Sequence, residues 1–333
     1  MPIEPSRTAL SRRSFAVAGA GAVLLPATVL AGTARAAGAA QTEVTVSPID
    51  LDGPAVTTVT VTVRNTAPKR LRDVRVSFSG PVGWVVEPEE RAVKGGIAPN
   101  SHATVTFELL VPAPGSGFRL LNFTATALYE GGDGLTRATV TRTERRGEPL
   151  PTLAAAYNNV GITDESNTAP GDFDGGGNSF SAQKLTDVGL SPGASVTALG
   201  ADLTWPDIQP GAKDNVSSGG QAIALSGSGS KLVFLGSGVG NNAVGTARVF
   251  YTDGTSSTGS FGFPNWSFQN VTDHGATQIA ASNGRNRQDG YGNAGVMYSV
   301  FAHSVPLDAG KTADLVVLPG QGGIHVFAMA IAG

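Results

Sequence analysis

The polar stretches at 157–164 and 171–183 hold the densest set of side chains that could do chemistry. Asp172 and Asp174 stand at i and i+2 in a glycine-rich loop, a spacing that lets two carboxylates give oxygens to one hard cation such as Ca²⁺. No Glu closes this loop at the EF-hand distance. The loop therefore predicts either a Ca²⁺ site at Asp172 and Asp174 or a tight turn in which the carboxylates cap backbone N–H groups.

Aromatic side chains near planar polar groups indicate sugar binding. A sugar needs an exposed aromatic face for its C–H patches, and amides, carboxylates or Arg for its hydroxyl pairs. Trp205 and Trp266 lie in the loop-like contexts Trp-Pro-Asp and Pro-Asn-Trp, and a second polar loop spans 285–291. The alternative is that each Trp fills space between sheets and that this loop is a solvated turn. The predicted ligand contacts are Trp205, Trp266, Arg285, Asn286, Arg287 and Tyr291.

Short strings that match catalytic motifs lack the groups that would make them work. Gly-x-Ser-x-Gly occurs at 189–193, but Pro192 follows the serine and has no backbone N–H for an oxyanion hole. Ser181 and Ser228 each begin a Ser-x-x-Lys string without its Ser-Asp-Asn and Lys-Thr-Gly partners. The four histidines show no metal-ligand spacing. We predict no catalytic residue.

Residues 1–40 have the pattern of an export signal: a basic start, a short apolar run of small residues and an Ala-Arg-Ala end. Arg12 and Arg13 lie in Ser-Arg-Arg-Ser-Phe, which resembles the twin-arginine signal. The sequence therefore predicts a secreted, extracellular protein that the twin-arginine export machinery carries across the membrane. The alternative is a chance Arg pair in an ordinary signal peptide.

Composition narrows the classes of partner. Without the predicted leader the chain has 19 Lys and Arg and 25 Asp and Glu, and this net charge of −6 disfavours binding to nucleic acid, so we predict no nucleic-acid partner. The chain contains no cysteine, so its stability has to come from a packed core. No second apolar run reaches the ~20 residues of a membrane span, which predicts no span in the mature chain.

The elements that would position these residues are strands. Period-two alternation of β-branched residues begins at Thr42 and continues to 137–141, with turn clusters between the runs, which is typical of a small β-sandwich. A charged segment with two prolines follows at 146–153, and beyond it Asp, Asn and Gly crowd into turns between further strands. The predicted fold is all-β: an immunoglobulin-like sandwich over 41–145, a linker over 146–153 and a jelly-roll-like sandwich over 154–333.

The first sandwich resembles a known accessory module. Its Pro-Val-Gly-Trp turn at 81–84, its Ile-Ala-Pro-Asn-Ser turn at 97–101 and the strand Ala-Thr-Val-Thr-Phe at 103–107 resemble the NEW3 domain found beside the catalytic domains of bacterial α-galactosidases. The resemblance implies a spacer or packing partner and not a catalytic unit.

The second sandwich is similar to a C-terminal β-sandwich module of secreted actinobacterial glycoside hydrolases. The residues that carry the similarity are Asn-Asn-Val-Gly-Ile at 158–162, the run from Phe173 to Gln183, Leu-Thr-Trp-Pro at 203–206 and His-Val-Phe-Ala at 325–328. The similarity implies a galactose-binding-like accessory fold and does not identify a ligand.

Together these patterns predict a non-catalytic carbohydrate-binding or accessory protein whose partner is a polysaccharide or a cell-wall glycan. Two alternatives stay open. One is a structural protein that binds the cell wall or another protein. The other is an unrecognised glycan hydrolase or lyase on the second sandwich.

Overall fold

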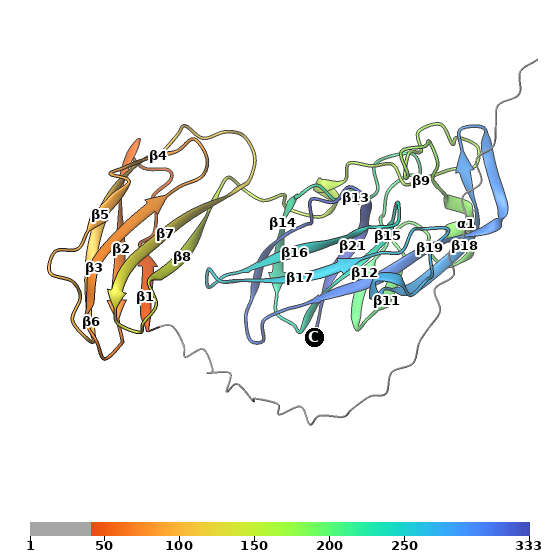
Figure 1. Cartoon of the computed structure of the whole chain (residues 1–333). Helices are drawn as coiled ribbons and strands as arrows, with labels where there is room; N and C mark the ends of the chain where they lie inside the picture. The colour runs from red at the N-terminus through yellow and green to blue at the C-terminus, as the bar shows by residue number, and fades with distance from the viewer. Residues whose placement is uncertain (1–40) are drawn as a thin grey trace, which may run out of the picture.

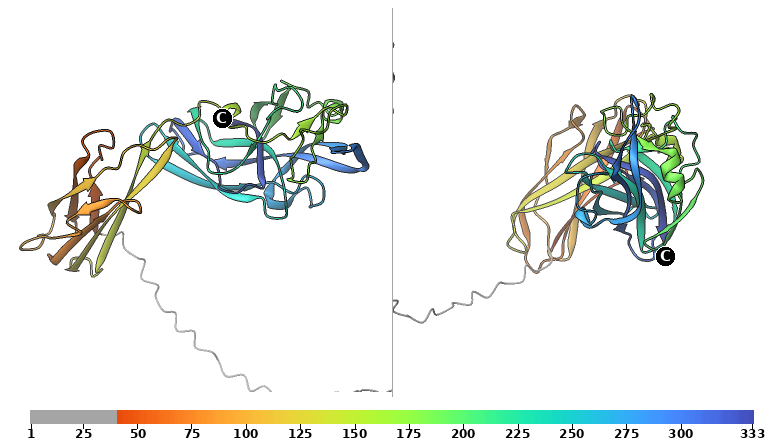
Figure 2. Two further views of the ribbon diagram at one scale, coloured as in Figure 1. Left: turned by 90° about the horizontal axis from the view of Figure 1, so that it is seen from above. Right: turned by 90° about the vertical axis from the view of Figure 1, so that its right-hand side faces the viewer.

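The structure is a computed structural model that describes residues 41–333. It contains two regions of antiparallel sheet that lie end to end (Figures 1 and 2). The predicted export signal, with Arg12 and Arg13, lies outside the described residues. Within 41–333 no helix has the length and apolar character needed to cross a bilayer.

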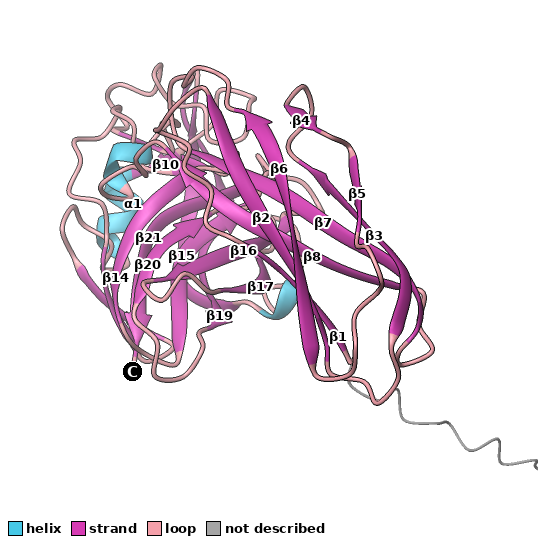
Figure 3. Ribbon diagram, turned by 90° about the vertical axis from the view of Figure 1, so that its left-hand side faces the viewer, coloured by secondary structure: helices cyan, strands magenta, loops and turns pink. Residues whose placement is uncertain are grey.

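The first region, in red to yellow in Figure 1, is a sandwich of two four-stranded antiparallel sheets (Figure 3). Alternation produces it: in β2 the residues Val59, Val61 and Val63 are fully buried, and the threonines between them point away from the core. Phe78 stacks on Phe123 at 6.1 Å to fill the space between the sheets. The sheets are β1 (Thr42–Val46), β2 (Val56–Asn65), β6 (Ser101–Leu110) and β4 (Val85–Glu87), and β5 (Glu90–Ala92), β3 (Leu71–Ser79), β7 (Arg119–Gly131) and β8 (Arg137–Arg146).

The second region is built on a five-stranded and a four-stranded sheet that enclose a core between them. Phe234 and Phe261 stack in this core at 4.2 Å. The five-stranded sheet is β13 (Val216–Ser217), β21 (Ile324–Ala332), β15 (Lys231–Gly238), β19 (Gly290–Pro306) and β18 (Thr277–Arg287), and the four-stranded sheet is β14 (Ala222–Gly227), β20 (Ala313–Val317), β16 (Val244–Tyr251) and β17 (Ser256–Gly262).

The five-stranded sheet is covered on both faces, which gives the second region a third layer. Leu232 and Phe234 of β15 point into the core between the sheets, and Val233 and Leu235 point into a separate cluster on the opposite face. The covering layer comes from 159–205 and contains β9 (Ile162–Thr163), β10 (Phe180–Ser181), α1 (Ala182–Asp187), β11 (Ser195–Ala198) and β12 (Ala201–Thr204). The short helix η1 (Ala154–Ala156) precedes this layer and packs Ala156 into the core between the sheets. A further short helix, η2 (Asp273–Gly275), precedes β18.

The predicted all-β fold of two sandwiches is confirmed, and two local predictions need correction. The sequence pattern predicts no helix, whereas α1 is helical: Ser181 Oγ accepts from the backbone N–H of Lys184 at 3.1 Å and so caps its start. The segment 285–291, predicted as a loop, is the tip of the β18–β19 hairpin, with Arg287 paired with Gly290. One helical turn and one hairpin tip are too short to show periodicity.

The segment 146–153 is fixed to the second region and does not act as a free spacer. The backbone N–H of Leu150 donates to Ala222 O at 2.8 Å, and Ala224 N–H donates to Leu150 O at 2.8 Å, so Leu150 extends the edge of β14. Arg145, at the end of β8, forms an ion pair with Asp314 of β20, and its guanidinium lies 4.7 Å from the ring centre of Phe250. These contacts join the two sandwiches directly.

Candidate functional site

A groove of about 600 Å³ opens among the loops of the second sandwich. Four segments far apart in the sequence form it: the covering layer at 159–175, Ser217 of β13, the β15–β16 loop at 239–242 and the approach to β21 at 321–325. Most of its polar lining consists of planar amides and carboxylates, namely Asn159, Asp172, Asp174, Asn241, Asn242 and Gln321.

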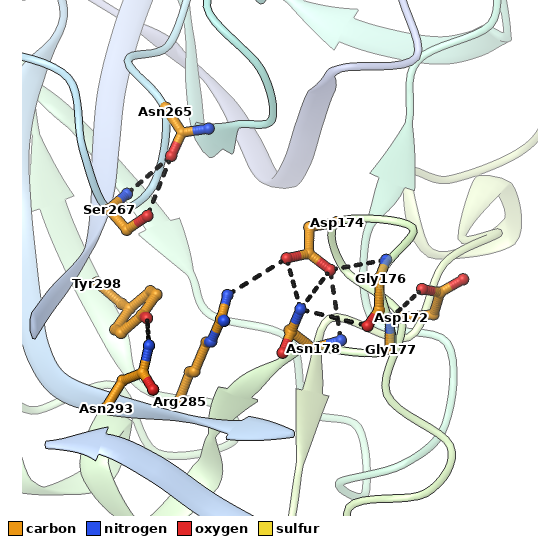
Figure 4. Close-up of polar contacts among 10 residues, drawn as sticks. All are labelled: Asp172, Asp174, Gly176, Gly177, Asn178, Asn265, Ser267, Arg285, Asn293 and Tyr298. Carbon is orange, nitrogen blue, oxygen red and sulfur yellow. Dashed lines mark hydrogen bonds and ion pairs between the residues drawn. The ribbon is translucent and has the colours of Figure 1, made fainter. Parts of the chain in front are cut away.

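The loop that carries the two predicted metal ligands is held by its own hydrogen bonds (Figure 4). Asp172 Oδ1 accepts from Gly177 N–H at 2.9 Å, and Asp174 Oδ1 accepts from Gly176 N–H at 2.9 Å. Asn178 Nδ2 donates to both oxygens of Asp174, at 3.1 and 2.9 Å. Gly177 has a φ of 72°, which favours glycine, so the chain can turn sharply enough to make these bonds.

Arg285 ties this loop to the β18–β19 hairpin. Its Nη1 lies 3.6 Å from Asp174 Oδ2, and its guanidinium stands 5.7 Å from the ring centre of Tyr298. In the other strand of the hairpin, β19, Asn293 Nδ2 donates to the Tyr298 hydroxyl at 3.3 Å (Figure 4). The side chain of Arg285 is 24% exposed, so the ion pair is partly shielded from water.

The donor set does not fit the predicted Ca²⁺ site. Four groups already occupy the oxygens of Asp174: the backbone N–H groups of Gly176 and Asn178, the Asn178 side-chain amide and the Arg285 guanidinium, which at 3.6 Å repels a cation. Within 41–333 no group of three or more His, Cys, Asp or Glu side chains is placed to hold a metal ion. The geometry of Asp172 and Asp174 matches the turn with capping carboxylates.

A buried polar network lies beneath the groove and reaches its floor at His325. The Asp214 carboxylate accepts from the backbone N–H groups of Gly161 at 3.0 Å and Ile162 at 2.8 Å, and from Asn215 Nδ2 at 2.7 Å. Asn215 Oδ1 lies 2.7 Å from His325 Nδ1. Because the Asn215 amide nitrogen donates to Asp214, its oxygen is the acceptor, which assigns the proton of His325 to Nδ1.

Burial sets the charge states of this floor. Loss of water around the carboxyl raises the pKa of Asp214 to about 7, although hydrogen bonds from the Asn215 side chain and from backbone N–H groups act to lower it. Burial lowers the pKa of His325 to about 4, so its ring is neutral at pH 7. His325 lines the groove, and its Nε2, which has no hydrogen-bond partner among the described residues, is left as an acceptor.

Both predicted aromatic platforms lie in the core. Trp205 is 1% exposed and stands 4.6 Å from the ring of Phe327, and Trp266 is 2% exposed and stands 4.8 Å from the ring of Phe173. Stacking against a sugar needs an open ring face, and burial under the covering layer removes it from both residues. The structure thus matches the alternative in which each Trp fills space against a sheet.

The predicted contacts in the hairpin divide into separate environments. Asn286 is buried and donates to Thr163 O at 2.8 Å, so it fastens the hairpin to the covering layer. Arg287 is exposed and pairs with Asp289 at 3.0 Å, and the Tyr291 hydroxyl donates to Asn283 O at 2.9 Å. Among these predicted hairpin contacts only Arg285 is close to the groove, because it forms an ion pair with Asp174, which lines it. Ligand binding by the others stays a prediction.

Several lining residues carry a sequence signal that lies outside the predicted site. Asn241 and Asn242 follow a glycine between two strands, and Gln321 lies between two glycines just before another strand. Amides next to glycines in strand connections favour turns, and the same turns place amides at the ends of a sandwich. The folded chain brings the side chains of Asn159, Asn241 and Gln321 to one groove.

Family comparisons match nearly the whole described chain. Residues 149–333 match the model of the AziU2-like beta-sandwich domain, and residues 54–127 match the NPCBM-associated, NEW3 domain of alpha-galactosidase. No curated protein matches the chain.

Solved structures add no further argument. The secreted serine protease VesC from Vibrio cholerae aligns at 10% identity and a TM-score of 0.25, over 80% of this chain and 48% of that one, so the chain spans about half the length of VesC. The CupB2 chaperone from Pseudomonas aeruginosa aligns at 11% identity and a TM-score of 0.22, over 83% of this chain and 93% of that one. Because its match to residues 149–333 covers more than half of the sequence, the chain belongs to the family of the AziU2-like β-sandwich domain, with a NEW3 domain before it.

Proposed function

We propose that this accessory β-sandwich protein is secreted through the twin-arginine route and binds a polysaccharide or cell-wall glycan without catalysis of its own. The observation that carries the proposal is the groove lined by amides and carboxylates in the second sandwich. The NEW3 match supports it, since that domain is named for its occurrence in α-galactosidase, an enzyme that acts on glycans.

The groove offers the hydrogen-bonding groups that sugar hydroxyls need. Each hydroxyl donates one hydrogen bond and accepts others, and a planar amide presents a donor and an acceptor side by side. The side chains of Asn241 and Asn242 are exposed and bond to no described residue, so both amides are free for a ligand. His325 Nε2 supplies an acceptor at the floor.

Size and rigidity agree with a small-molecule or chain-end ligand. A volume of about 600 Å³ falls in the range of about 300–1,000 Å³ that is common for ligand sites. The Asp172–Asn178 loop and the Asp214 network are hydrogen-bonded without a ligand, so binding would lose little ordering entropy.

Retention on polysaccharide tests the proposal. Residues 41–333 are mixed with insoluble plant, fungal and bacterial polysaccharides, and the protein left in solution is measured. We expect retention on at least one polymer, and we expect the Asn241→Ala/Asn242→Ala double variant to lose it. Asn122→Ala, which removes an exposed amide from β7 of the first sandwich, is the matched control and should bind as the unmodified protein does. Equal retention of the double variant would exclude this groove as the site.

A further inference from the structure

One aromatic side chain is conspicuous on the described surface. Phe268 is 66% exposed, and it is the only aromatic residue among the large hydrophobic side chains exposed within 41–333. A single exposed apolar residue is ordinary on a protein surface. The surroundings of Phe268 distinguish it.

The loop that presents Phe268 is fixed on both sides. Asn265 Oδ1 accepts from the backbone N–H of Ser267 at 3.0 Å and from its hydroxyl at 3.2 Å (Figure 4), and Gln269 Oε1 accepts from Asn265 N–H. Trp266, two residues before Phe268, is anchored in the core 4.6 Å from the ring of Tyr298. The aromatic ring is therefore held out by an ordered turn and not by a free loop.

The same loop supports the wall of the groove. Gln269 Nε2 donates to Asn241 O at 3.1 Å, and Asn265 Nδ2 donates to Gly240 O at 3.4 Å. Gly240 and Asn241 line the groove. Phe268 is thus exposed and directly precedes Gln269, the residue whose side chain holds the groove wall at Asn241.

We propose that Phe268 is an aromatic platform at the rim of the groove, which stacks on the C–H face of one pyranose unit while a neighbouring unit occupies the amide-lined groove. The inference rests on the proposed function and deepens it, because it requires a glycan of at least two units and not a free monosaccharide. Aromatic rings and the apolar face of a sugar attract each other through the ring's electron density and through release of water. The fixed turn lets the ring bind without ordering the loop first.

The test compares Phe268→Ala, Phe268→Tyr and Phe268→Trp with the unmodified protein in titrations with the soluble hexasaccharide and monosaccharide of whichever polymer retains the protein. We expect Phe268→Ala to weaken hexasaccharide binding about fivefold to tenfold, the size of a lost aromatic contact, and the two aromatic variants to keep it. Monosaccharide binding should be unchanged in all three. Leu135→Ala, which removes another exposed apolar side chain in the first sandwich, is the control and should change neither titration.

A second readout separates contact from folding. In Phe268→Trp the new indole is exposed, so hexasaccharide should shift its emission to shorter wavelength and protect it from acrylamide quenching. Unchanged hexasaccharide affinity in Phe268→Ala, together with lost binding in Asn241→Ala/Asn242→Ala, would overturn the platform and leave the proposed function standing. Absence of glycan binding by the unmodified protein would overturn both.

Discussion

Replacing Asp214 by Asn should reverse the way that folding stability depends on pH. In the folded protein the pKa of Asp214 rises from 3.8 to about 7. The folded state therefore keeps a proton that the unfolded state loses across this range, so the Asp214 contribution falls as pH rises. At about 1.4 kcal/mol for each pH unit, the ionised carboxylate costs about 4 kcal/mol of stability at pH 7.

His325 acts in the opposite direction. Its pKa falls from 6.5 to about 4 on folding, so between these values the unfolded state holds the extra proton and stability rises with pH. The same conversion gives a gain of about 3 kcal/mol from pH 4 to 7. The two contributions nearly cancel in the unmodified protein, and their sum changes by about 1 kcal/mol downward across this range.

The assay is urea unfolding followed by tryptophan fluorescence at pH 4, 5.5 and 7. For Asp214→Asn we expect stability to rise, from pH 4 to 7, by about 3 kcal/mol more than it does in the unmodified protein, because the Asp214 contribution is removed and the His325 contribution is left unopposed. The substitution also costs a hydrogen bond, since an amide nitrogen cannot accept from Gly161 or Ile162, so the slope is the informative quantity and not the absolute value. Asp289→Asn, which changes an exposed carboxylate in the hairpin, is the control. If Asp214→Asn follows the same curve as the unmodified protein, the buried network does not titrate as described.

Three further outcomes follow from the packing and the charges. Trp266→Ala should lower stability by about 3–5 kcal/mol, the cost of an aromatic cavity in a core, as measured by the same urea unfolding; a loss under 1 kcal/mol would contradict the burial of its ring. Arg145→Ala should cost about 1 kcal/mol or less, since its ion pair with Asp314 is partly exposed, but hydrogen exchange at the Leu150 amide should speed up; unchanged exchange would show that Arg145 does not hold the junction. Adding Ca²⁺ or a chelator should leave the melting temperature unchanged, and a rise of several degrees with Ca²⁺ would show that the carboxylates of the 172–178 loop bind the ion after all.

The alternation of apolar and polar residues predicts those strands that have one face buried in the core and the other face toward solvent. β2 shows this most clearly, because buried valines alternate with threonines from Val59 to Val63. β18 (Thr277–Arg287) was missed, since its Ser, Asn and Gly residues have the composition of a turn although they pair with β19. Strand pairing compensated for their low β propensity, and pairing partners are not visible in a local pattern.

The site was harder to predict than the strands for a physical reason. Trp205 and Trp266 have loop-like neighbours, and only the covering layer, which is folded back over the five-stranded sheet, turns them into core residues. The groove combines Asn159 with Gln321, which are brought together by the fold and not by any local motif. The spacing of Asp172 and Asp174 identifies them as a pair. Arg285, whose positive charge disfavours a cation beside Asp174, lies more than 100 residues later in the β18–β19 hairpin, so local spacing does not reveal it.

The central claim is that the amide-lined groove binds a glycan, and side-chain amide NMR tests it most directly. The spectrum of residues 41–333 is recorded while a hexasaccharide is added that is derived from a polymer that retains the protein. The account predicts that the NH₂ signals of Asn241, Asn242 and Gln321 shift in a saturable way while that of Asn122 stays in place. Saturable shifts that leave the groove amides unmoved, or no shift with any polymer fragment, would contradict it.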